Sequence, residues 1–236
     1  MSKKCGEIII DKLEKRYQDI LSQFELSKIY DDDKLSGIFL AKPASSYFES
    51  DRKVIVIGQE TKGWRKNECR IKNGSNTDLE SIRASMDCSL NFNLKKPKTS
   101  RFRQFYKKAS SFLDSGTGDA YNSAIWSNQF CMSFNGKSPR KSKSFAKIQQ
   151  LSSLLLQAQF EILKPDIAIF TVGSGRDVFI KEAFNHETVK VITPKRLWHF
   201  KVGNTQCFRT NHPRWYGSYP YLNEALELSL KHSVRD

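Results

Sequence analysis

Two hydrophobic patterns alternate along the chain: short runs rich in β-branched residues, and longer stretches with apolar residues at helical spacing. Val54 to Ile57 is a run of four β-branched residues, as expected for a strand buried on both faces of a parallel sheet. Similar runs predict further strands over residues 124–133, 166–173, 189–192 and 205–210, and a short edge strand over 37–40.

The stretches between these runs have the periodicity of amphipathic helices. They predict helices over residues 7–26, 78–86, 101–113, 148–163, 177–184 and 221–231. Alternating strands and helices are typical of a parallel sheet that is covered on both faces. Because the sequence has no internal repeat and no linker, we expect residues 1–236 to form a single α/β domain.

Polar residues follow or interrupt three of the predicted strands. Gly58 ends the first strand and is followed at once by Gln59 and Glu60, at the strand end where open α/β sheets bind their ligands. Asn128 lies inside the second strand, where a buried amide needs partners and therefore either braces a loop or contacts a ligand. Asn211-His212-Pro213 follows the last predicted strand, although a histidine there could also be a satisfied loop residue.

Composition narrows the class of protein. A hydrophobic content of 39% and an aromatic content of 12% are typical of a folded globular chain. The net charge of +14 indicates a polyanionic partner or surface. No apolar run approaches the length of a membrane span, and the N-terminus lacks the apolar core of a secretory signal. We therefore expect a cytoplasmic monomer with no membrane partner.

The cysteines and histidines do not indicate a metal site. The five cysteines are scattered, form no C-x-x-C pair and are odd in number, which argues against a zinc site, an iron–sulfur cluster and a disulfide framework. The four histidines are also dispersed. We expect neither a metal nor a cofactor.

The positive charge is concentrated in two stretches. Residues 137–147 contain five Lys or Arg among eleven, and no Asp or Glu occurs from Ala120 to Phe160. The second stretch interleaves aromatic residues with Lys95, Lys96, Lys98, Arg101, Arg103, Lys107 and Lys108. Such clusters neutralise the phosphates of nucleic acids, whereas the simpler alternative is a solvated basic face.

Three of these features together resemble motifs of the uracil-DNA glycosylase superfamily. Gly58-Gln59-Glu60 resembles its first motif, commonly Gly-Gln-Asp-Pro-Tyr, and Asn211-His212-Pro213 resembles its second, His-Pro-Ser. The strand with Asn128 resembles the one whose Asn contacts the base edge, and the three motifs occur in the expected order across residues 54–219. The resemblance implies a three-layer α/β/α sandwich around a mostly parallel, four-stranded sheet. It also implies an enzyme that hydrolyses the N-glycosidic bond of a flipped-out base in single- or double-stranded DNA.

The resemblance also assigns roles to individual residues. Glu60 would stabilise the sugar cation and orient water, and His212 would donate a hydrogen bond to the departing base. Base contacts would come from Gln59, Asn128 and a stacking Phe92. DNA contacts would come from Lys62, Lys141, Lys143, Arg214, Trp215 and Tyr216, with either Tyr216 or Trp215 as the wedge that fills the vacated stack.

Two departures from the family pattern concern mechanism and substrate. Glu60 replaces the usual Asp or Asn, and Lys62 stands where uracil-specific members carry a Tyr that blocks bulk at C5 of the pyrimidine. A pocket without that Tyr favours a bulky C5-modified cytosine, such as the glucosylated hydroxymethylcytosine of phage DNA. Some prokaryotic members of the superfamily act in defence against such phage, so the resemblance also implies a role in antiviral defence. No lysine stands at the carboxylate position to form a Schiff base, which predicts a monofunctional glycosylase.

Three alternatives stay open at this point. The first is a uracil-DNA glycosylase of base-excision repair, and the second is a non-catalytic DNA-binding module with the same fold. The third is a Rossmann-like nucleotide-binding enzyme, in which Gly173-Ser174-Gly175 would bind phosphate at a helix N-terminus.

Overall fold

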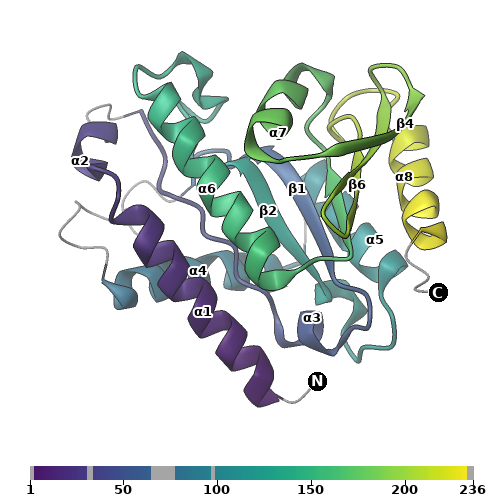
Figure 1. Cartoon of the computed structure of the whole chain (residues 1–236), viewed down its shortest axis with the longest axis horizontal. Coiled ribbons are helices and arrows are strands. Elements are labelled where there is room, and N and C mark those ends of the chain that lie inside the picture. Colours follow the sequence, from purple (N-terminus) through teal and green to yellow (C-terminus); the bar gives the residue numbers. More distant parts are fainter. Residues whose placement is uncertain (1–2, 31–33, 65–77, 97–98, 233–236) are drawn as a thin grey trace.

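A mostly parallel six-stranded sheet organises the chain (Figure 1). The structure, a computed structural model, describes residues 3–30, 34–64, 78–96 and 99–232. The strand order is β2-β1-β3-β6-β5-β4. Four neighbouring strands are mutually parallel: β2 (Ala124–Phe130), β1 (Val54–Glu60), β3 (Ile167–Phe170) and β6 (Thr205–Arg209). The antiparallel strands β5 (Leu197–Val202) and β4 (Glu187–Thr193) extend the sheet beyond β6.

The sheet differs from the predicted one in its extent. The four parallel strands match a four-stranded sheet, but the complete sheet has six strands because β4, β5 and β6 form two successive hairpins. Strand β5 was not predicted. A usable signal lay in Gly203-Asn204, a two-residue hairpin turn between paired Val202 and Thr205, with φ of 54° at Gly203.

The predicted edge strand over residues 37–40 is wrong. This segment is extended and buried, but it does not belong to any strand of the sheet. Its backbone amides instead donate hydrogen bonds to carbonyl groups that follow two of the strands. Gly37 N–H donates to Trp64 O after β1, and Phe39 N–H donates to Cys131 O after β2. The segment therefore covers the polar backbone that follows β1 and β2.

Helices cover both faces of the sheet, as predicted (Figure 1). Helices α1 (Lys3–Leu21), α6 (Phe145–Leu163) and α7 (Asp177–Ala183) lie on one face, and α5 (Arg101–Leu113) and α8 (Tyr219–Lys231) lie on the other. The short helices are α2 (Leu26–Ile29) and α3 (Ser45–Glu49), with 3₁₀ turns η1 (Ala120–Asn122), η2 (Pro139–Lys141) and η3 (Ser174–Arg176). No described helix is both long enough and apolar enough to cross a membrane.

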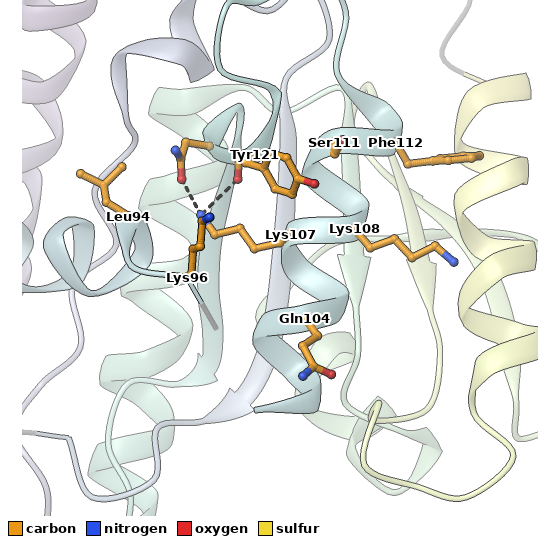
Figure 2. A pocket seen from close by; sticks show the side chains of 9 residues that line it. Leu94, Lys96, Gln104, Lys107, Lys108, Ser111, Phe112 and Tyr121 are labelled. Atoms are coloured by element: carbon orange, nitrogen blue, oxygen red, sulfur yellow. Dashed lines mark hydrogen bonds between the residues drawn. The ribbon is translucent and has the colours of Figure 1, made fainter. Parts of the chain in front are cut away.

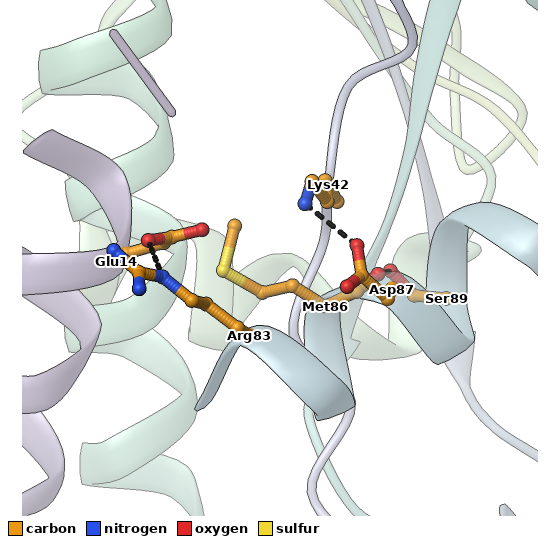
Figure 3. A network of polar contacts seen from close by, with 6 residues as sticks. All are labelled: Glu14, Lys42, Arg83, Met86, Asp87 and Ser89. Atoms are coloured by element: carbon orange, nitrogen blue, oxygen red, sulfur yellow. Dashed lines mark hydrogen bonds and ion pairs between the residues drawn. The ribbon is translucent and has the colours of Figure 1, made fainter. Parts of the chain in front are cut away.

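Helix α4 (Leu79–Leu94) is longer than predicted and is held in place by two ion pairs (Figure 3). It begins at Asp78, whose side chain accepts a hydrogen bond from Ser81 N–H. Arg83 bonds the buried Glu14 of α1 at 2.6 Å, and Lys42 bonds Asp87 at 2.6 Å, on either side of the buried Met86. These contacts hold the first two-thirds of α4, and Phe92 follows in its last turn.

Helix α5 is anchored to the sheet through the buried Tyr106. Its hydroxyl donates to Ala124 O, the first residue of β2, at 2.8 Å. The helix begins at Ser100, whose hydroxyl accepts from Arg103 N–H. Since Phe102 lies one turn before Tyr106 on the same face of the helix, this anchor directs its ring toward the carboxyl ends of β1 and β2.

Candidate functional site

A pocket of about 580 Å³ opens where the parallel strands β1 and β2 end. The structure brings together in its lining seven of the predicted site residues: Gln59, Glu60, Lys62, Phe92, Asn128, His212 and Arg214. They come from β1 and the residues directly after it, from β2, from helix α4 and from the segment after β6. They converge because parallel strands present their carboxyl ends at one edge. We call this cavity the base pocket.

The side-chain amide of Asn128, which lines the base pocket, is oriented by a neighbouring tryptophan. Its Oδ1 accepts a hydrogen bond of 3.2 Å from the indole N–H of Trp126. Because an indole can only donate, this contact orients the amide, with Oδ1 toward Trp126 and Nδ2 turned away from it. The residue is 6% exposed, and Nδ2 has no hydrogen-bond partner among the described residues. A buried, unpaired donor is costly, so the site favours a ligand that supplies an acceptor.

Gly58 makes room for this arrangement. It is paired in register with Asn128 on the neighbouring strand. A Cβ at position 58 would lie 2.7 Å from Asn128 Oδ1 and 3.1 Å from the ring of Phe102. The absence of a side chain therefore allows the amide and the phenyl ring to approach the backbone of β1.

His212 is a neutral hydrogen-bond donor at neutral pH. Burial, reinforced by the positive charges of Arg214 and Arg176, lowers the pKa of His212 to about 4. Its Nδ1 accepts a bond of 3.1 Å from Arg214 N–H, which places the imidazole proton on Nε2. The ring lies nearly parallel to that of Phe102, with centroids 6.3 Å apart and an interplanar angle of 21°.

Glu60 forms a buried ion pair that the sequence did not indicate. Its Oε2 accepts a bond of 2.6 Å from Arg176 Nη2, and both side chains are largely buried. Burial lowers the pKa of Arg176 and the carboxylate of Glu60 opposes this shift. The bond to Arg176 restricts the orientation of the Glu60 carboxylate, while Oε1 is left outside the bond.

Gln59 braces the base pocket. Its Nε2 donates to Val172 O at 2.8 Å, which joins the end of β1 to the segment after β3. That segment continues into the predicted phosphate-binding glycines, where Gly173 adopts a φ of 78° and Arg176 turns toward Glu60. Arg176, which directly follows these glycines, therefore pairs with a carboxylate that lines the base pocket.

Aromatic side chains form one wall of the pocket. Trp126 packs against Phe92 with centroids 5.7 Å apart and against Phe102 with centroids 5.6 Å apart, and Trp64 lies 5.5 Å from Phe92. The guanidinium of Arg103 lies 4.3 Å from the centroid of Phe92. Phe102, Trp126 and Trp64 were not predicted as site residues. The signal for Phe102 was its place among the basic residues 95–108.

Four predicted DNA contacts lie outside the base pocket's lining. Lys141 and Lys143 are exposed in the loop between β2 and α6, which begins beside the pocket, since a Cβ on Gly136 would lie 3.8 Å from Lys62. Trp215 is 40% exposed with the guanidinium of Arg196 4.0 Å above its ring, whereas Tyr216 is 93% exposed. Lys98 and Cys69 lie outside the described residues.

No protein-family model matches the chain, and no curated protein is detectably similar to it in sequence.

Proposed function

We propose that the protein is a monofunctional DNA glycosylase of the uracil-DNA glycosylase-like superfamily. It hydrolyses the N-glycosidic bond of a modified pyrimidine and leaves an abasic site. One observation carries the proposal: the unpaired amide donor of Asn128, the neutral imidazole of His212 and the carboxylate of Glu60 line one aromatic-walled pocket. These groups match the base edge, the leaving group and the sugar of a flipped-out nucleotide.

The reaction separates charge in a way that these groups can stabilise. Cleavage of the C–N bond leaves positive charge on the sugar and negative charge on the departing base. Glu60, held in position by its ion pair with Arg176, stabilises the sugar cation and orients the attacking water. His212 Nε2–H donates to the carbonyl oxygen of the base. Removing one such donor costs roughly 10²–10³ in rate.

The orientation of the Asn128 amide favours a cytosine-type base over uracil. Cytosine carries lone pairs at both O2 and N3, whereas uracil carries a hydrogen at N3. Because the Trp126 N–H draws Oδ1 toward the indole, the Nδ2 hydrogens of Asn128 point the other way, and a uracil N3–H facing these hydrogens would leave two donors opposed. A pyrimidine leaves room in the pocket of about 580 Å³, whose rim includes Lys62 in place of a blocking Tyr. These features support a bulky C5-modified cytosine as substrate. For an enzyme with that substrate we propose a cytoplasmic role in antiviral defence.

Exposed basic side chains near the pocket can bind the DNA backbone, and a monomer is sufficient to supply them. Arg214, Lys141 and Lys143 are exposed and free to approach phosphates, with Lys141 and Lys143 in the loop that starts beside the pocket. Tyr216 is the better wedge, because its ring is almost fully exposed while the ring of Trp215 is stacked with Arg196.

Incubation with defined oligonucleotides tests the proposal. Matched single strands and duplexes would carry uracil, cytosine, hydroxymethylcytosine or glucosylated hydroxymethylcytosine at one position, followed by alkali to reveal abasic sites. We expect cleavage after alkali with the glucosylated base, and no covalent trapping of the protein by borohydride. Binding without abasic sites on any substrate would instead identify a non-catalytic module.

A further inference from the structure

A second and larger pocket lies over the outer side of α5. It has a volume of about 1110 Å³ and is lined by Leu94, Lys96, Gln104, Lys107, Lys108, Ser111, Phe112, Tyr121 and Asn122. We call it the α5 pocket (Figure 2). Lys96 lines both this pocket and the base pocket, so the two cavities are contiguous at that residue.

The lining of the α5 pocket is positively charged and includes exposed apolar surface. It contains three lysines and no acidic residue. Lys107 is buried, and its ammonium donates to Tyr121 O at 3.1 Å and to the side chain of Asn122, while Lys108 extends the other way and bonds Asn223 of α8 at 2.8 Å (Figure 2). The ring of Tyr121 is 62% exposed, and Phe112 and Leu94 are also exposed.

Helix α5 connects the two pockets with one polar stripe. Arg101 lines the base pocket, and Gln104, Lys108 and Ser111 line the α5 pocket at the three- and four-residue spacing of one helix face. From residue 101 to residue 111 the helix axis rises about 15 Å. That length corresponds to roughly four stacked nucleotides at 3.4 Å each.

We propose that the α5 pocket binds an unpaired strand of nucleic acid on one side of the nucleotide held in the base pocket. The position of this strand rests on the proposed function, but its binding does not require excision. Lys96 and Lys108 contact phosphates, and Tyr121 and Phe112 stack on bases. Stacking on exposed rings requires bases with free faces, which an unpaired strand has and a duplex does not.

Binding of unmodified oligothymidylate tests this without any excision. Fluorescence anisotropy would compare strands of two to twelve nucleotides at several salt concentrations, using the full chain and the variants Tyr121→Ala, Tyr121→Phe, Lys108→Gln and, as a matched control on the distant β4, Lys190→Gln. We expect Tyr121→Ala to weaken binding roughly 5- to 150-fold, the cost of one lost base stack, and Tyr121→Phe to bind like the wild type. Lys108→Gln should reduce the slope of log K against log salt by about 0.7, unlike Lys190→Gln.

Three results would overturn the proposal. The first is unchanged affinity and salt slope in Tyr121→Ala and Lys108→Gln, or no binding of oligothymidylate at all. The second is a loss of affinity confined to fully paired duplexes, which would assign the pocket to a duplex flank. The third is equal competition by polyglutamate, which would indicate a site for acidic peptides. None of these depends on excision, so a failure of the glycosylase proposal would be seen separately, as an absence of abasic sites.

Discussion

Replacement of Trp126 by phenylalanine should relax the selectivity of the base pocket. The variant keeps an aromatic wall but removes the only hydrogen-bond donor that the described residues offer to Asn128 Oδ1. The amide is then free to turn and present Oδ1 to the ligand, where it can accept a hydrogen bond from N3–H of uracil. We therefore expect Trp126→Phe to excise uracil faster relative to the modified cytosine.

The size of this change follows from the hydrogen bonds involved. In the wild type, a uracil N3–H that faces Asn128 Nδ2–H leaves both donors buried without an acceptor. Each unpaired donor costs about 1–3 kcal/mol of binding free energy. If the variant gives one of these donors a hydrogen-bond acceptor, the ratio of the uracil to the modified-cytosine excision rate would rise by roughly 5- to 150-fold. The smaller ring also loses packing in a buried position, so absolute rates are expected to fall for both substrates.

Trp64 supplies a matched control for the loss of an indole. It lines the same pocket and is equally buried, but its Nε1 has no hydrogen-bond partner within the described ranges. Trp64→Phe should therefore leave the rate ratio unchanged. Single-turnover excision on oligonucleotides that differ only at the target base measures the ratio directly. The reasoning is wrong if Trp126→Phe keeps the wild-type ratio, or if Trp64→Phe shifts it equally.

Three further predictions concern catalysis, pH and DNA affinity. Glu60→Gln should fold and bind DNA, yet excise about two or more orders of magnitude more slowly in single-turnover assays; a near wild-type rate would exclude its carboxylate from the reaction. The unfolded chain protonates His212 near pH 6.5 and the folded chain only near the lowered pKa of about 4, so this residue should reduce thermal stability as pH falls between these values. His212→Gln should show a smaller decline in melting temperature; an identical decline would contradict the lowered pKa. Neutralising Lys141 and Lys143 together should reduce the salt slope of duplex binding by about 1.8, measured by anisotropy, and an unchanged slope would mean that the loop faces away from DNA.

Much of the fold could be predicted from local patterns. Burial requires apolar side chains at a spacing that depends on the element, so it can be recognised in the sequence. This spacing predicted the strand at Val54–Ile57 and the helix over residues 101–113. The same logic placed Gln59, Asn128 and His212 at one edge, because each lies on or just beyond the end of a parallel strand. Strand β5 was missed although breakers stand at both of its ends, Pro194 before it and the Gly203-Asn204 turn after it.

The chemical state of the site was decided only by the tertiary structure. Arg176 reaches Glu60 from 116 residues away, and no local pattern records that meeting. Trp126 lies on the same strand face as Asn128, which period two predicts, but whether the indole N–H reaches the amide oxygen depends on side-chain rotamers set by Phe92, Phe102 and the space above Gly58. Periodicity determines which residues share a face, whereas hydrogen bonding depends on the direction of individual atoms, and packing by distant segments sets that direction.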